Sequence, residues 1–177
     1  MNDIKTKCPQ FPALIDPFGR TLNYLRIAVT GRCNLRCSYC MPPEGVPFLA
    51  HEQIMRFEEI LRVVQLMLAS RLKKVRITGG EPLIRKGVIP FLQELRQLSP
   101  QLKIHLSTNG LLLADYLSDL EAFHLNGINI SLDTLNPVKF EKNYASEWFS
   151  QSLAGIATGA EKPDIFRTEH GRATRPE

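Results

Sequence analysis

Over residues 23–142, apolar positions follow two alternating periods. Short runs rich in β-branched residues are typical of buried strands. They cover residues 25–30, 74–78, 102–107 and 128–132. Between them, apolar residues recur three or four positions apart, as on one face of a helix. The predicted helices are 52–70, 88–98 and 112–125, and Asn136-Pro137 marks the start of a fourth.

Strand and helix therefore alternate four times. This order predicts βαβ units around a parallel sheet, an α/β fold. Such sheets bind their ligands at the carboxyl ends of the strands. The polar loops that follow each predicted strand are therefore the expected position of a functional site.

The two ends of the chain lack this alternation. Residues 1–22 contain three prolines and a predicted turn at 16–19, and we interpret them as an irregular leader. Residues 143–177 show no sustained period, with at most one short helix near 147–156. We expect an aberrant or disordered tail there, grafted onto a core at 23–142.

Cys33, Cys37 and Cys40 stand in one short run after the first predicted strand. Three thiolates on one loop can hold an iron–sulfur cluster and leave one iron open to a ligand that is not protein. A structural zinc site instead needs a fourth protein ligand. The fourth cysteine, Cys8, lies in the leader.

Two other interpretations of the cysteines stay open. His51 could complete a zinc site, although residues 42–45 (Pro-Pro-Glu-Gly) form a breaker-rich loop before it. A disulfide is disfavoured, because the count in the run is odd and we find no signal peptide. The net charge of +4 is spread along the chain and does not favour nucleic acid binding. With no apolar run of bilayer length, we expect no membrane partner. Without targeting signals, and with thiols expected to be reduced, we expect a cytoplasmic protein.

Two motifs carry a resemblance to a known family. The pattern Cys-x-x-x-Cys-x-aromatic-Cys, with Tyr39 as the aromatic residue, resembles that of the radical S-adenosylmethionine (SAM) enzymes. Residues 78–82 (Thr-Gly-Gly-Glu-Pro) resemble their second hallmark. The stretches around these motifs are similar to the molybdenum cofactor biosynthesis protein A family, the GTP 3′,8-cyclases. The similarity runs from about residue 16 to residue 142 and includes 107–110 and 129–133.

The resemblance implies a fold, cofactors and a partner. The fold is an incomplete radical-SAM (β/α)6 partial TIM barrel of about four βα units, with an irregular C-terminal tail. The three cysteines would hold one [4Fe–4S] cluster, whose open iron SAM chelates. The second cluster of the family cannot form here, because no cysteine follows Cys40. An electron donor is implied, and a homodimer is possible.

The resemblance also assigns residues to SAM. They are Tyr39, Gly79, Gly80, Glu81 and Ser131. Glycines lack a Cβ, which lets backbone carbonyls approach the ammonium group of the ligand. Glu81 could add a charge-assisted bond to that group, and the Ser131 hydroxyl suits the carboxylate. The alternative for the glycines is a plain strand-to-helix turn. The alternative for Tyr39 is a buried structural aromatic.

The implied substrate is GTP, and the matching positions are Arg26, Arg76 and Ser107. Guanidinium groups suit phosphate oxygens, although a lone arginine on a strand is usually a surface residue. The implied lyase reaction converts GTP to (8S)-3′,8-cyclo-7,8-dihydroguanosine 5′-triphosphate through a 5′-deoxyadenosyl radical. There are two alternatives. The chain could belong to another radical SAM enzyme, such as a peptide or cofactor maturase, or it could be a catalytically inactive fragment.

Overall fold

A computed structural model describes residues 11–42, 44–47, 49–144, 150, 151, 153, 154 and 157 of the 177-residue chain. Its centre is a four-stranded sheet in the order β1-β2-β3-β4. The strands are β1 (Tyr24–Ala28), β2 (Lys74–Thr78), β3 (Lys103–Thr108) and β4 (Gly127–Ile130). All three pairings are parallel, so the predicted parallel α/β sheet is confirmed.

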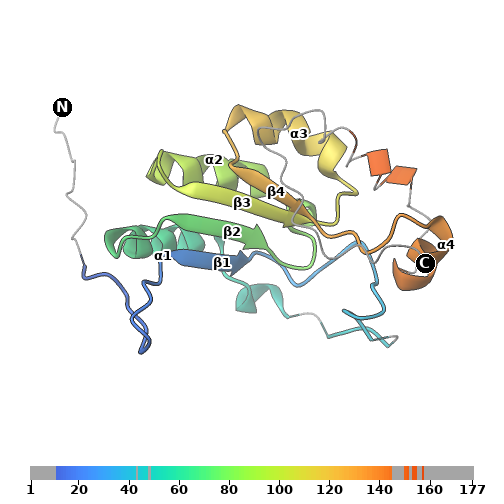
Figure 1. The fold of residues 1–177 in the computed structure, drawn as a ribbon, viewed down its shortest axis with the longest axis horizontal. Coiled ribbons are helices and arrows are strands. Elements are labelled where there is room, and N and C mark those ends of the chain that lie inside the picture. Colours follow the sequence, from blue (N-terminus) through green and yellow to red (C-terminus); the bar gives the residue numbers. More distant parts are fainter. Residues whose placement is uncertain are drawn as a thin grey trace.

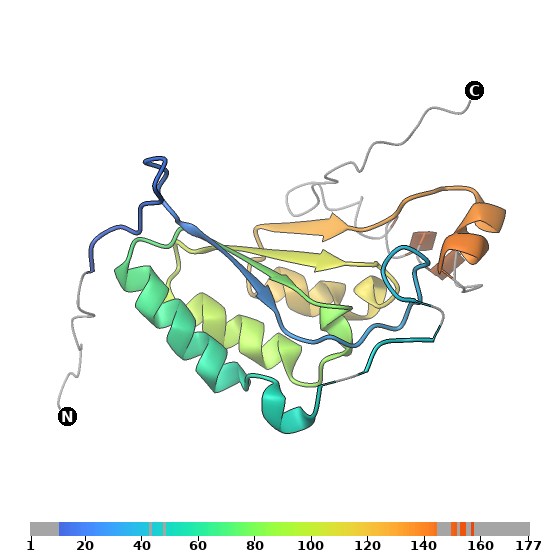
Figure 2. The same ribbon diagram turned by 90° about the horizontal axis from the view of Figure 1, so that it is seen from below.

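Three helices cover one face of this sheet (Figures 1 and 2). They are α1 (Phe57–Ala69), α2 (Val88–Leu98) and α3 (Leu113–Ala122). Alternate strand residues point toward them, because side chains alternate across a strand. Val75, Ile77, Ile104, Leu106 and Ile128 are fully buried on that face. The apolar runs of the sequence therefore form the main core.

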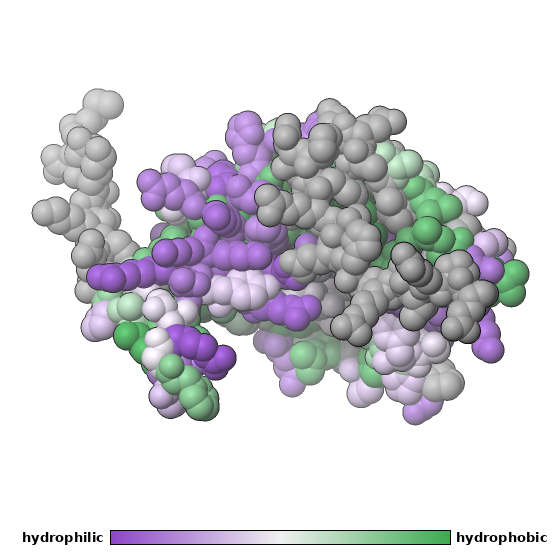
Figure 3. Space-filling model, in the orientation of Figure 1, coloured by the Kyte–Doolittle hydropathy of each residue, from purple (hydrophilic) through white to green (hydrophobic). Residues whose placement is uncertain are grey.

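The opposite face of the sheet is polar. Figure 3 looks onto it, and hydrophilic side chains gather over the part of the strands that can be seen. Arg26 pairs in register with Arg76, and Arg76 with His105. Ser107 lies two residues beyond His105 on the same face, opposite Asn129. This arrangement lets the sheet present cationic and hydroxyl groups on one surface.

Helix boundaries agree with the sequence except at the start of α1 and at the end of α3, which stops at Ala122 and not at residue 125. The helix predicted from residue 52 begins at Phe57, and a short 3-10 turn, η1 (His51–Gln53), precedes it. The Glu59 carboxylate accepts a hydrogen bond of 2.7 Å from the Arg56 backbone N–H, which sets the helix start there. At α4 (Pro137–Tyr144) the predicted cap is confirmed, since Lys139 N–H donates to Asn136 Oδ1 at 3.1 Å.

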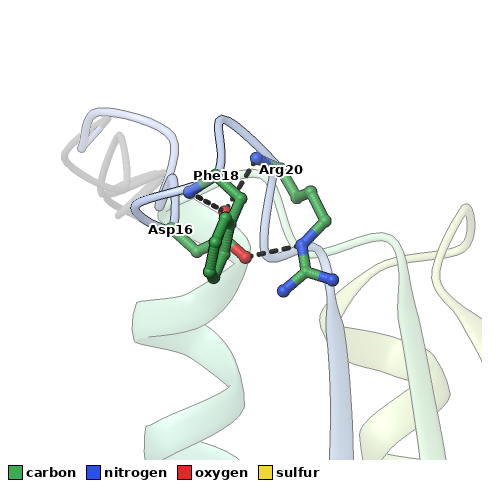
Figure 4. Close-up of polar contacts among 3 residues, drawn as sticks. All are labelled: Asp16, Phe18 and Arg20. Atoms are coloured by element: carbon green, nitrogen blue, oxygen red, sulfur yellow. Dashed lines mark hydrogen bonds and ion pairs between the residues drawn. The ribbon is translucent and has the colours of Figure 1, made fainter.

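Residues 11–22 form a folded turn at the amino end of the sheet. Ile15 and Thr21 make an antiparallel bridge. The Asp16 carboxylate accepts hydrogen bonds from the backbone of Phe18 and Arg20 and pairs with Arg20 Nε at 2.7 Å (Figure 4). The predicted turn at 16–19 is therefore present, and Phe18 at its tip is 82% exposed. The leader upstream of Phe11 lies outside the described residues.

Among the described helices, none has the length and apolar character needed to cross a membrane. Beyond Tyr144 the described residues 150, 151, 153, 154 and 157 are helical. The rest of the segment assigned to the tail lies outside the described residues, so the boundary at 142 stays a prediction.

Candidate functional site

The loop that carries the three cysteines follows β1 and lies at the carboxyl end of the sheet (Figure 2). Two backbone hydrogen bonds tie it to the turn after β2. Gly80 N–H donates to the Thr30 carbonyl at 2.8 Å, and Glu81 N–H donates to the Arg32 carbonyl at 2.9 Å. The two hallmark motifs of the sequence are therefore in direct contact.

Gly79 and Gly80 make this contact possible. A Cβ at Gly79 would lie 2.4 Å from the Thr30 carbonyl oxygen, and one at Gly80 would lie 2.2 Å from that of Arg32. No side chain fits at such distances. The structure thus gives these glycines a role that the sequence did not reveal, close approach of the cysteine loop. Their contact with SAM stays a prediction.

Glu81 is fully buried beneath this contact. Its carboxylate accepts hydrogen bonds from Leu83 N–H at 3.0 Å, from the Thr108 hydroxyl at 2.9 Å and from Asn109 N–H at 2.8 Å. Burial raises the pKa of Glu81, and the Asn109 hydrogen bond opposes that rise. Glu81 therefore joins the ends of β2 and β3. Its predicted bond to the SAM ammonium is not tested by these contacts.

Asn109 extends this network to the first cysteine. Its side-chain amide donates to Asn34 Oδ1 at 2.8 Å and to the Cys33 sulfur at 3.8 Å. Leu35 N–H also donates to that sulfur, at 3.4 Å. The Leu111 N–H also donates to the Asn109 side-chain oxygen, a bond typical of a turn. The contact with Cys33 was missed.

The three cysteines are free thiols. Cys33 and Cys37 are half-buried and Cys40 is exposed, and burial raises the pKa of the first two thiols. Among the described residues, no three histidine, cysteine or acidic side chains stand in ready metal-binding geometry. The three thiols thus share one loop, but in this structure they are not arranged around a common metal position.

This donor set fits an iron–sulfur cluster. Thiolates are the usual ligands of such clusters, and the exposed Cys40 gives access from solvent. The disulfide alternative is not observed for these three residues. Cys8 and the His51 side chain, the candidate fourth ligands for zinc, lie outside what the structure describes.

Tyr39 lies beside the end of α4. Its ring meets the Tyr144 ring edge-on, with 6.4 Å between centroids and an interplanar angle of 77°. Partial desolvation, followed by hydrogen bonds with Asp133 and Tyr144, raises the pKa of Tyr39. More than half of the residue is exposed, so the alternative of a buried structural aromatic is wrong.

Ser131 directly follows β4, and its N–H donates to the Thr108 carbonyl at 2.9 Å. It is exposed at the carboxyl edge, where the sequence places the site. Its assignment to SAM stays a prediction.

The three residues assigned to substrate lie on the open face of the sheet. Arg26 and Arg76 are register partners on neighbouring strands, and Ser107 lies closer to the carboxyl edge. His105 joins this row and was missed. Its ring covers Gly127, where a Cβ would lie 2.8 Å from the imidazole Nδ1. The polar alternation of Lys103, His105 and Ser107 along β3 is the signal that could have identified it.

The chain resembles known proteins over most of its length. It is 54% identical over 143 residues to a GTP 3′,8-cyclase of Peptoclostridium acidaminophilum, covering 81% of this chain and 44% of the relative. It is 47% identical over 148 residues to a GTP 3′,8-cyclase of Petrotoga mobilis, covering 84% of this chain and 46% of the relative. The chain thus spans about half the length of these curated relatives.

A solved structure shows the same fold. Histidine-tagged anSMEcpe with bound AdoMet superposes with a TM-score of 0.65 at 22% identity, covering 81% of this chain and 41% of that one. The sequence profile of the Radical SAM superfamily matches residues 27–161. This match takes in the cysteine loop and nearly all of the sheet and helices described above. The chain belongs to the radical SAM superfamily.

Proposed function

We propose that this chain is the cluster- and SAM-binding portion of a GTP 3′,8-cyclase of molybdenum cofactor biosynthesis. One observation carries the proposal: three free thiols lie at the carboxyl edge of a sheet whose open face carries Arg26 and Arg76 in register. The identity of 47–54% to proteins named GTP 3′,8-cyclase supports this choice of substrate.

Cys33, Cys37 and Cys40 would hold one [4Fe–4S] cluster and leave one iron for SAM. Once bound, the cluster and SAM would supply the radical chemistry at the substrate. The chain's own residues bind and orient. Tyr39 would flank the cluster on the α4 side, where its ring packs edge-on against Tyr144.

The glycine turn and the end of β4 would hold SAM. Gly79 and Gly80 keep the backbone of residues 78–81 against the cysteine loop, so their carbonyls can reach an ammonium group next to the cluster. The Ser131 hydroxyl suits the SAM carboxylate. Glu81 can add a direct bond to the ammonium group in the loaded protein, and its three internal donors also fix the turn.

Arg26, Arg76 and Ser107 would bind GTP. Two guanidinium groups on neighbouring strands suit the triphosphate, because a planar fork matches phosphate oxygens. The conversion to the cyclic product would also need an electron donor. A cluster site that needs reduced cysteines would be at home in the cytoplasm. A homodimer is compatible with this arrangement.

Anaerobic reconstitution with iron and sulfide tests the cluster. About four irons per chain, together with 5′-deoxyadenosine released from SAM on reduction, would support the proposal. The Cys37→Ser variant should lose both signals. A single bound zinc and a colourless protein would contradict it.

Equilibrium dialysis with GTP tests the substrate. Arg76→Ala should weaken GTP binding by about tenfold or more, the loss expected for a charge-assisted contact to phosphate. Arg62→Ala on the exposed side of α1 is the matched control and should bind as the parent chain does. Deoxyadenosine release without GTP binding would favour another radical SAM enzyme, such as a peptide maturase. Loss of both would favour an inactive fragment.

A further inference from the structure

The last turn of α4 carries the cysteine loop. Arg36 N–H donates to the Tyr144 carbonyl at 3.3 Å, and Ser38 N–H donates to the Asn143 carbonyl at 2.7 Å. The final carbonyls of a helix have no partner within the helix. Here the segment between the first and last cysteine provides donors for two of them. The loop is therefore docked on the end of α4 by its backbone.

A small apolar cluster lies beneath this contact. Phe140 and Tyr144 are each 1% exposed, and their ring centroids are 4.4 Å apart. Leu35 and Leu111 complete the cluster, and Cys33 and Cys37 pack against it. We call these four residues the α4 cluster. It is separate from the main core and supports the thiols from one side.

The Tyr144 phenol connects three segments. Its oxygen accepts a hydrogen bond of 2.8 Å from Asp133 N–H, in the loop that follows β4. Its ring also packs edge-on against that of Tyr39, which lies between two of the cysteines. Burial, the largest cause, raises the pKa of Tyr144 to about 12, so the phenol keeps its proton at neutral pH.

The cysteine loop thus has two kinds of support. On the sheet side, Cys33 is held through Asn109 and Asn34. On the other side, Tyr39 and the loop backbone contact Tyr144. We propose that Tyr144 is a positioning residue for the Cys37–Cys40 half of the loop, and that it sets the spacing of those thiols relative to Cys33. This inference rests on the proposed function only in taking the loop as the cluster site.

Alkylation of the cluster-free chain tests this directly. The rate of iodoacetamide modification of each cysteine is measured by mass spectrometry in the parent chain and in Tyr144→Phe. The variant keeps the ring and removes the hydroxyl. Cys37 should react about fivefold faster, because loss of one buried hydrogen bond makes local opening more frequent by about that factor. The rate at Cys33 should rise by less than about twofold. Tyr116→Phe on α3 is the matched control and should leave all three rates unchanged.

The pattern across the cysteines decides the outcome. An unchanged Cys37 rate would overturn the proposal, and so would an equal acceleration of all three cysteines, which indicates general loosening. If Tyr144→Phe does not fold, Tyr39→Leu removes the ring that packs against Tyr144 and should give the same selective acceleration. Because no cluster is present, the result stands whether or not reconstitution succeeds. In a reconstituted chain, Tyr144→Phe should also lose iron to a chelator faster than the parent.

Discussion

The main core and the α4 cluster are built in different ways. The main core joins strands and helices that follow one another along the chain, and its buried residues are mostly aliphatic. The α4 cluster joins Leu35, Leu111, Phe140 and Tyr144, which come from distant segments and lie beside polar contacts. The comparison indicates that the first region provides stability, while the second, with the Glu81 network, determines where the thiols lie.

The largest effect is expected in the main core. Leu92 on α2 is fully buried, so Leu92→Ala should lower the free energy of unfolding by about 3 kcal/mol, through lost burial and a cavity. Urea unfolding measures this. Leu66→Ala on the exposed side of α1 should change it by less than about 0.5 kcal/mol. In the folded Leu92→Ala chain the alkylation rate of Cys37 should stay at the parent value. A large increase in that rate would show that the main core also determines where the thiols lie.

Gly80 tests the contact between sheet and cysteine loop. A methyl group there would collide with the Arg32 carbonyl, so Gly80→Ala should cost about 1–3 kcal/mol and displace the loop. Gly31→Ala is the matched control, because nothing lies within 4 Å of its Cβ position. Urea unfolding and cysteine alkylation report the two effects. Equal behaviour of the variants would show that the close approach is unimportant.

Glu81 gives a smaller effect that depends on pH. Glu81→Gln removes an acceptor for Thr108 or Asn109 and should cost about 1–2 kcal/mol near pH 5. Because burial raises the pKa of Glu81, the folded parent chain binds more protons than the unfolded chain between the ordinary and the raised value. The free energy of unfolding of the parent chain therefore falls as pH rises through that window. Its advantage over Glu81→Gln should become smaller.

Urea unfolding at a series of pH values measures this difference. Glu94→Gln, at an exposed position on α2, is the control for loss of one charge. The raised pKa would be contradicted if the gap in free energy of unfolding between the parent chain and Glu81→Gln widened with rising pH.

The smallest effect is expected at the N-terminal turn. Asp16→Asn should speed amide exchange at Phe18 and Arg20, since the carboxylate accepts from both, and leave the unfolding midpoint unchanged. The Arg20 backbone hydrogen bond is the main reason that the pKa of Asp16 is lowered. The turn should therefore persist above the ordinary aspartate pKa and loosen only as pH falls through the lowered value. Amide shifts that move at higher pH would contradict this.

Elements whose residues follow a clear period were predicted well. β2 and α2 have the expected bounds, because their apolar periods stop at clear breaks, Gly79 after β2, and Gly87 before and Ser99-Pro100 after α2. The start of α1 was wrong, since the Glu59 side chain caps the helix at Arg56 and the apolar period does not record that contact. Periodicity reports which face is buried, and side-chain hydrogen bonds decide where an element begins.

The candidate site was predicted as a set of residues but not as a network. Motif spacing identified the cysteines and the glycine turn, and the family resemblance identified Arg26 and Arg76. The bonds of Asn109 and Tyr144 to the cysteine loop join residues far apart in sequence, and no local pattern marks them. Tyr144 moreover lies just past the residue where the predicted core ends, because α4 continues through it.

Docking of the cysteine loop on α4 also has a consequence for the order of folding. Surface helices owe most of their stability to packing, and α4 packs through Phe140 and Tyr144 against Leu35 of the cysteine loop. It must therefore be stabilised by the loop it supports, and the two become ordered together. During synthesis, therefore, the thiols can reach their final arrangement only after residue 144 has emerged from the ribosome. By then β1 and β2 have long been available to pair.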